Sequence, residues 1–187
     1  VEALNVKPGE QVRLTFHIGG TMEAEVLTDG WHPEGDIAFL RLSTPLPGGA
    51  IPALLGKSDK CNGHAYIALG YPEDGDVQAR WPQGNIGGLV PVNGWSSSLL
   101  QLQGAEVDKG LSGAPVLDIT TDRVVGMLTR VQTLENRQLQ APKIRYAYAM
   151  SAEAITTHAP RSLTLHSWDL DVPQKAFIPG KRAPTLF

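Results

Sequence analysis

At positions 110–115 the chain reads Gly110-Leu111-Ser112-Gly113-Ala114-Pro115, and the apolar pair Val116-Leu117 follows. Glycine adopts backbone angles and permits close approaches that residues with a Cβ cannot. A nucleophilic serine needs such a setting, because its oxygen must stand clear of the backbone while neighbouring N–H groups converge where an oxyanion forms. Gly, Ser and Pro are also common in surface turns. The hexapeptide alone therefore leaves two interpretations open, a catalytic serine loop and an ordinary turn.

The 20 glycines and 14 prolines of the whole chain divide it into short segments, several with the alternation of half-buried β-strands. One short helix is predicted over 152–158, capped by Ser151 and stopped by Pro160. Many short strands with almost no helix indicate an all-β sandwich or barrel. The strands expected are 11–16, 23–27, 36–42, 64–69, 98–102, 114–118, 123–128 and 145–150.

Composition and charge fit a globular protein and exclude several classes of function. Of the 187 residues 42% are hydrophobic and 19% are charged, which is enough apolar material for a core. The net charge of −3, with scattered cations, provides no basic surface for nucleic acid. No apolar run approaches the roughly 20 residues that span a bilayer, so no membrane partner is expected. The single cysteine, Cys61, excludes an internal disulfide and is compatible with the cytoplasmic location that we expect.

No metal or cofactor is expected from the sequence. Cys61 stands in Lys60-Cys61-Asn62-Gly63 without neighbours of ligand type, and no cluster of Cys and His has the spacing of a metal site. Cys61 is therefore interpreted as an ordinary buried or half-buried thiol.

Four segments occur in an order that resembles a known family. They are Asp36-Ile37-Ala38-Phe39-Leu40-Arg41-Leu42, Leu69-Gly70-Tyr71-Pro72, the hexapeptide at 110–115, and Val124-Val125-Gly126-Met127. In an all-β chain this set is similar to trypsin-like serine peptidases. Within that family the chain is most similar to the bacterial, disulfide-free branch. This branch includes the high-temperature-requirement proteases and the peptidase modules of signalling or defence proteins. The resemblance implies two six-stranded antiparallel β-barrels with the active site in the crevice between them, the first barrel incomplete at the N-terminus, and one short C-terminal helix.

The resemblance also implies the catalytic residues. Ser112 would be the nucleophile, Asp36 the carboxylate that orients the base, and the N–H groups of Gly110 and Ser112 the oxyanion hole. Removing one donor of this kind costs roughly 3–4 kcal/mol of transition-state stabilisation. The expected activity is that of a serine endopeptidase that cleaves polypeptides through an acyl-enzyme on Ser112.

Substrate-binding residues are implied around the same loop. Glu106 lies where the family's specificity pocket has its floor, and a carboxylate there favours Lys or Arg before the cut bond, unless loop length places it in solvent. Lys109 is expected at the rim of the crevice. An extended substrate would pair as an additional β-strand along a strand that begins with three residues, Thr129, Arg130 and Val131.

The resemblance identifies no residue of this chain as the general base. The family places a histidine upstream of the aspartate, after an apolar strand, and we expect it just before Val1, so that the 187 residues alone are inactive. Asp36, His64 and Ser112 reproduce the residue order of subtilisin-like enzymes, but those are α/β proteins whose serine begins a long helix. The remaining histidines are interpreted as strand-end, turn or surface residues: His17, His32, His158 and His166.

The expected peptidase domain covers 1–160, with 1–58 in the first barrel and 59–160 mainly in the second. Residues 161–187 form a tail or a linker. Further domains of a larger signalling or defence protein are suggested by family analogy alone. The alternative function is a catalytically inactive module whose crevice binds peptides, and a third is an unrelated β-sandwich adhesion or structural domain. Retention of Asp36, Gly110, Ser112 and Gly113 argues against a decayed site, which has no chemical need for all four.

Overall fold

The computed structural model describes residues 6–16, 20–48, 50–71, 79–91, 93, 97–104, 110–134 and 144–160, with the side chains of 131–134 and 144–145 left out. The chain divides into two compact units. The first lies within Val1–Ala53 and takes in the segment that begins at Ile155, and the second lies within Leu54–Ala154.

The first unit contains a three-stranded antiparallel sheet in the order β1-β2-β3. β1 (Gln11–Phe16) pairs over its whole length with the start of β2 (Gly20–His32), and β2 pairs with β3 (Ile37–Leu42). Side chains of β1 alternate between exposed and half-buried, as the polar–apolar alternation of its sequence predicts. A 3-10 turn at Pro33–Gly35 leads from β2 to Asp36.

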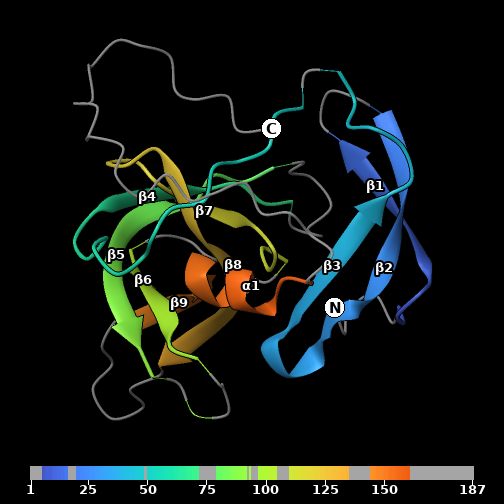
Figure 1. Cartoon of the computed structure of the whole chain (residues 1–187). Helices are drawn as coiled ribbons and strands as arrows, with labels where there is room; N and C mark the ends of the chain where they lie inside the picture. The colour runs from blue at the N-terminus through green and yellow to red at the C-terminus, as the bar shows by residue number, and fades with distance from the viewer. Residues whose placement is uncertain are drawn as a thin grey trace. The chain divides into compact units, whose positions relative to one another are not determined.

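The second unit is a closed antiparallel β-barrel, which Figure 1 shows from the side of α1. Closure removes the free edges that an open sheet presents to other chains. Pairing of β7 with β4 completes the ring. In order around the barrel the strands are β4 (Ala65–Ala68), β5 (Gln83–Val90), β6 (Leu99–Gln103), β9 (Ile144–Ser151), β8 (Arg123–Leu134) and β7 (Pro115–Asp118).

The core of the barrel is a single cluster of buried side chains. Full burial of one Val, Leu or Ile side chain stabilises a fold by about 1.5–3 kcal/mol, so this cluster is a main source of the unit's stability. It includes two residues of the hexapeptide, which ties that loop to the core. The members are Cys61, Tyr66, Ala68, Ile86, Leu100, Leu102, Leu111, Ala114, Val116, Val125, Leu128, Ala147 and Ala149.

β5 is a barrel strand that the sequence pattern did not predict. Its sequence QGNIGGLV contains three glycines, which are depleted in strands. The structure shows what two of them do. A Cβ on Gly84 would collide with the carbonyl of Gln103 on β6, and Gly88, at φ 94°, lies where the register of β5 against β6 shifts. Such a shift is a β-bulge, and glycine supplies the backbone freedom that it needs.

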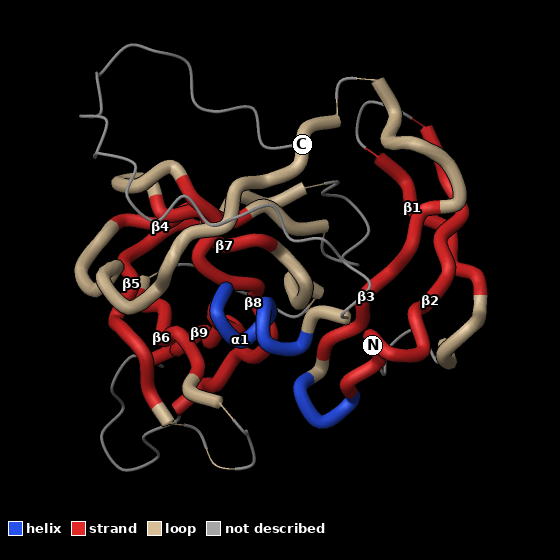
Figure 2. The backbone as a smooth tube through the Cα atoms, in the orientation of Figure 1, coloured by secondary structure: helices blue, strands red, loops and turns tan. Residues whose placement is uncertain are grey.

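The structure contains the one short helix that the sequence predicts, α1 (Ala152–His158), drawn in blue in Figure 2. The Ala154 N–H donates to Ser151 Oγ at 3.2 Å, which is the predicted N-cap. In the described part of the chain no helix has the length and apolar character needed to cross a membrane. The prediction of an all-β fold with an antiparallel barrel and one short helix is confirmed.

Gly126 provides a test of how tightly the barrel is packed. A Cβ at this position would lie 2.6 Å from the carbonyl oxygen of Met150 and 3.3 Å from the Cβ of Ala149. We expect Gly126→Ala to lower the free energy of unfolding by about 1–3 kcal/mol, the usual cost of overpacking. The control Gly48→Ala adds a Cβ that meets no atom within 4 Å and should change it by less than about 0.5 kcal/mol. Urea unfolding measures both, and equal transitions would contradict this account of the packing.

Candidate active site

Ser112 is exposed on a loop whose backbone has the conformation that its glycines permit. We call residues 110–114 the serine loop. Gly110 has φ 88° and Gly113 has φ 89°, both in the left-handed region that side chains with a Cβ rarely adopt. The Gly113 N–H donates to the carbonyl of Leu128 on β8 at 2.7 Å, which fixes the loop to the barrel. The glycines flanking Ser112 therefore have the conformational role that the sequence suggested.

Leu111 anchors the serine loop in the barrel core. Its side chain is 1% exposed, and it packs against Gly70, where a Cβ would come within 2.5 Å of Leu111 Cδ2. The Ala114 N–H donates to the Leu111 carbonyl at 3.1 Å and closes the turn around Ser112. Two of the sequence motifs, the one around Gly70 and the hexapeptide, are thus in direct contact because Gly70 leaves room for Leu111.

The N–H groups of the serine loop differ in whether a carbonyl of the described residues accepts from them. Those of Gly113 and Ala114 donate to carbonyl groups of the barrel and of the loop. Within the described residues, no acceptor takes the N–H of Gly110 or of Ser112. Backbone donors of this kind are what an oxyanion hole uses, because they are fixed before negative charge develops.

Thr129 is the neighbour of the Ser112 hydroxyl. Ser112 Oγ lies 3.4 Å from the Thr129 carbonyl oxygen, to which it donates a long hydrogen bond. The register of β8 against β9 shifts between Leu128 and Arg130, so Thr129 occupies a β-bulge and is 9% exposed. A bulge changes the direction of the backbone at one residue, and here the Thr129 carbonyl lies within hydrogen-bonding distance of Ser112. The sequence placed Thr129 near the substrate strand but carried no signal for the bulge.

The other substrate-binding residues predicted from the sequence are only partly described. Arg130 is exposed on β8, and Val131 continues that strand opposite Ala147. Glu106 and Lys109 lie outside the described residues, so their roles stay predictions.

Asp36 lies in the first unit, immediately after the 3-10 turn and before β3. Its backbone is left-handed, with φ 51° and ψ 40°, and its N–H donates to the Pro33 carbonyl at 3.2 Å. Aspartate is one of the few residues other than glycine that adopt this region readily, and Asp122 adopts it as well, with φ 56°. The half-buried carboxylate is thus held at a turn rather than inside the strand that the sequence predicted to begin with it.

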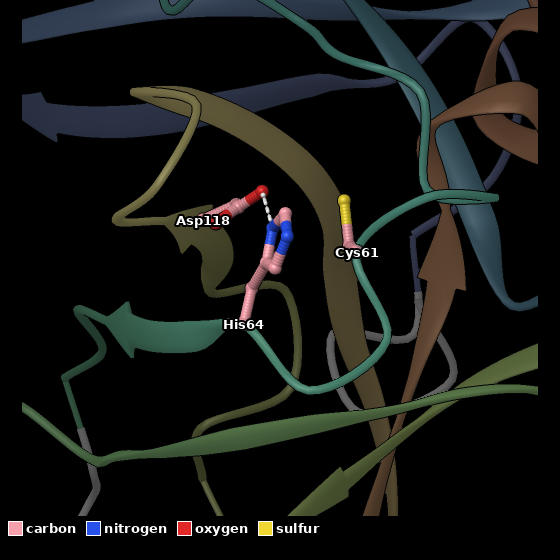
Figure 3. A group of neighbouring side chains, drawn as sticks. All are labelled: Cys61, His64 and Asp118. Atoms are coloured by element: carbon pink, nitrogen blue, oxygen red, sulfur yellow. Dashed lines mark hydrogen bonds and ion pairs between the residues drawn. The ribbon is translucent and has the colours of Figure 1, made fainter. Parts of the chain in front are cut away.

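A second group of reactive side chains lies in the barrel unit and consists of Cys61, His64 and Asp118 (Figure 3). Their potential ligand atoms all lie within 4.8 Å of one another, and His64 Nδ1 is 2.9 Å from Asp118 Oδ2. Cys61 and His64 precede β4, Asp118 ends β7, and these strands pair with Tyr66 opposite Asp118. The expectation that Cys61 lacks ligand-type neighbours is therefore wrong. The Cys-x-x-His spacing was the only local sequence signal for this cluster, because Asp118 lies far away in the chain and comes close only through the pairing of β4 with β7.

Asp118 is a fully buried carboxylate with several hydrogen bonds. It is 0% exposed, and it accepts from the Thr120 N–H at 2.9 Å and from Thr121 Oγ1 at 2.8 Å as well as from His64. Burial acts to raise the pKa of Asp118. The hydrogen bonds from His64, Thr121 and Thr120 outweigh burial, so the pKa lies below its ordinary value and the group is ionised.

The thiol of Cys61 is buried and protonated. It donates a hydrogen bond from Sγ to the Lys57 carbonyl oxygen at 3.2 Å. Burial, and then the neighbouring Asp118, raise the pKa of the thiol well above its ordinary value. Because the thiolate is the reactive form, Cys61 is a poor nucleophile in this state. Its interpretation as a buried thiol is confirmed.

The described histidines do not support a subtilisin-like arrangement. His64 is hydrogen-bonded through Nδ1 to Asp118, and the all-β fold excludes the α/β scaffold of those enzymes. His32 was expected to be solvated, but it ends β2 and its Nε2 is buried. Its ring packs edge-on against His158 of α1, with centroids 5.0 Å apart, so the two rings are not free surface side chains.

The family of the chain follows from comparison with known proteins. Residues 2–127 match the family described as the trypsin-like peptidase domain. This match covers more than half of the 187 residues, and the chain belongs to that family. No curated protein matches the chain.

Solved structures of HtrA-type proteases have the same fold. The protease AlgW with a decapeptide is 20% identical, with a TM-score of 0.61 over 79% of this chain and 42% of that one. Rv3671c from M. tuberculosis H37Rv, in an inactive form, is 19% identical, with a TM-score of 0.53 over 74% of this chain and 63% of that one. The chain thus spans less than half the length of AlgW. The predicted resemblance to trypsin-like and high-temperature-requirement proteases is confirmed at the level of family and fold.

The hydrogen bonds of Asp118 predict how stability depends on pH. Asp118→Asn should lower the free energy of unfolding at neutral pH by about 1–3 kcal/mol, the range for hydrogen bonds to charged groups. The pKa of Asp118 is lowered by folding. Its stabilisation is therefore complete above the unfolded pKa of about 3.9 and is lost as the pH falls through the folded pKa. Urea unfolding between about pH 7 and pH 3 should show the two proteins converging on acidification.

Asp122 is the matched control, because it is an exposed aspartate in the turn that follows Asp118. Asp122→Asn should change the free energy of unfolding by less than about 0.5 kcal/mol at either pH. A gap between the wild type and Asp118→Asn that stays constant with pH would contradict the assignment.

Proposed function

We propose that this chain carries the nucleophile of a serine endopeptidase and that Ser112 forms the acyl-enzyme with polypeptide substrates. The observation that carries the proposal is the serine loop. It presents an exposed hydroxyl between two glycines in left-handed conformations, with the Gly110 and Ser112 N–H groups available beside it. An ordinary turn requires neither the buried Leu111 anchor nor this pair of available donors.

The proposed chemistry uses these groups in two steps. Ser112 Oγ attacks the carbonyl carbon of the scissile bond while a histidine removes its proton, and the N–H groups of Gly110 and Ser112 stabilise the oxyanion. The histidine then protonates the leaving amine. A water molecule, activated by the same histidine, hydrolyses the acyl-enzyme.

We assign the general base to a histidine in the segment that precedes Val1 in the longer protein. Asp36 would hold that histidine in the required tautomer, which is the role of the aspartate in this kind of triad. The place of Asp36 supports the assignment, since it lies half-buried at the turn between β2 and β3, in the motif on which the family resemblance rests. His64 is disfavoured as the base because its partner is Asp118, the last residue of β7, whereas Ser112 precedes the first residue of that strand.

Substrate is proposed to bind as an extended strand along β8, beginning at Thr129 and continuing over Arg130 and Val131. The proximity of the Thr129 carbonyl to Ser112 supports this direction of binding. The AlgW structure with a decapeptide shows that a protein of the same fold binds a peptide. Glu106 is proposed to favour a basic side chain before the cut bond, and Lys109 to line the crevice.

Nucleophile variants test the proposal in the full-length protein. Ser112→Ala should abolish labelling by a fluorophosphonate and reduce peptide hydrolysis by about 10⁴-fold or more, because the nucleophile is lost. Asp36→Asn should reduce the rate constant kcat by about 10⁴-fold through the wrong histidine tautomer. Ser43→Ala, at an exposed serine of the first unit, should leave both readouts unchanged.

Absence of labelling and hydrolysis in the folded full-length protein would overturn the peptidase proposal. The alternative is the inactive peptide-binding module, and binding of an extended peptide measured by calorimetry distinguishes it. Peptide binding that survives Ser112→Ala without any turnover in the wild type would favour that alternative.

A further inference from the structure

We propose that Cys61, His64 and Asp118 form a binding site for a zinc-type divalent cation, separate from the proposed catalytic residues. The three side chains offer a sulfur, an imidazole nitrogen and a carboxylate oxygen, all within 4.8 Å of one another. Zinc prefers these three ligand types and is usually bound with tetrahedral geometry. The cluster therefore supplies three of four ligands, and water would take the fourth position.

The His64–Asp118 pair has nearly the spacing that zinc requires. Zn–N and Zn–O distances near 2.1 Å place two tetrahedral ligands about 3.4 Å apart, and a Zn–S distance near 2.3 Å places the sulfur about 3.6 Å from either. His64 Nδ1 and Asp118 Oδ2 are 2.9 Å apart as a hydrogen-bonded pair, and all three ligand atoms lie within 4.8 Å of one another. A cation therefore requires the pair to open by about 0.5 Å and the Cys61 thiol to rotate towards it from the Lys57 carbonyl.

The backbone presents Cys61 and His64 in a fixed turn. The His64 N–H donates to the Cys61 carbonyl at 2.9 Å, and the Gly63 N–H donates to the Ile86 carbonyl of β5 at 2.7 Å. Gly63 has φ 82°, which lets the chain turn so that positions 61 and 64 face the same carboxylate. The turn therefore presents both side chains before any cation binds.

Asp118 is held by groups that would support it as a ligand. The Thr120 N–H binds Oδ1 and the Thr121 hydroxyl binds Oδ2, so the carboxylate is oriented independently of His64. Hydrogen bonds that orient a metal ligand typically contribute 10–100-fold in affinity, as an order of magnitude. This arrangement distinguishes the cluster from a chance gathering of exposed acidic groups.

Charge balance favours a divalent cation at this buried position. On binding, the Cys61 thiol loses its proton to solvent and becomes a thiolate. The proton that His64 Nδ1 donates to Asp118 is lost from Nδ1, Nε2 carries the one ring proton of the neutral imidazole, and Nδ1 binds the cation. The two positive charges of the ion are then matched by the thiolate and the Asp118 carboxylate. Cys61 and Asp118 are almost fully buried, and the His64 side chain is 24% exposed, so it provides the side open to solvent.

A bound cation would stabilise the short pairing of β4 with β7 that closes the barrel. β4 and β7 pair through only three residue pairs, and the cluster joins the turn before β4 to the end of β7. Ser112 precedes the start of β7, whereas Asp118 is its last residue. The cation would therefore stabilise barrel closure at the end of β7 away from the serine loop, and it is not part of the proposed peptide hydrolysis.

Cobalt titration of the full-length protein, after dialysis against a chelator, tests the site. We expect one Co²⁺ per chain with thiolate-to-cobalt charge-transfer absorption, and displacement of that signal by Zn²⁺. Cys61→Ser should abolish the charge-transfer band, and His64→Gln should weaken cobalt binding by about 100-fold or more, beyond the loss seen for residues that only support a ligand. Asp59→Asn, which removes an exposed carboxylate two residues before Cys61, should leave the titration unchanged.

A thermal readout separates this proposal from the peptidase proposal. Zn²⁺ should raise the melting temperature Tm of the wild type and of Ser112→Ala equally, and should have no effect on Cys61→Ser. Cobalt binding without thiolate absorption, or an unchanged titration in Cys61→Ser, would overturn the metal site whatever the peptidase assay shows. Loss of hydrolysis with an intact cobalt signal would overturn only the proposed enzymatic function.

Discussion

The pairing of β7 with β4 is the constraint on which the second unit depends. β7 has four residues, yet it closes the barrel by pairing with β4 on one side and β8 on the other. The serine loop leads into its first residue, and Asp118 ends it. One short strand therefore sets the position of the proposed nucleophile and of the Cys61–His64–Asp118 cluster, and the core around Leu111 and Val116 holds it in place.

Asp118 and Asp36 are two aspartates in different surroundings, and we assign them different roles. Asp118 is fully buried, and its hydrogen bonds lower its pKa despite burial. Asp36 is half-buried at a left-handed turn, a conformation that Asp122 also adopts. The barrel thus uses one ionised carboxylate to organise a turn, while the proposed mechanism uses the other to orient a histidine.

Local sequence patterns predicted most of the elements. Eight strands and α1 with its Ser151 cap were found where they were predicted, because side-chain alternation and capping are properties of neighbouring residues. β2 and β8, however, end five and six residues beyond their predicted limits. β5 was missed because its glycines serve a bulge and a close approach to β6. The roles of Glu106 and Lys109, the domain limits and the upstream histidine stay predictions.

By itself the sequence determined the class of fold, the family, and the serine loop with its two glycines. These depend on residue types at short spacing, which act through backbone conformation. Only the tertiary structure decided that Gly70 makes room for Leu111, that Thr129 sits in a bulge beside Ser112, and that Asp118 meets Cys61 and His64. The physical reason is that strand pairing and core packing join residues far apart in the chain, and no local pattern encodes which strand will lie next to which.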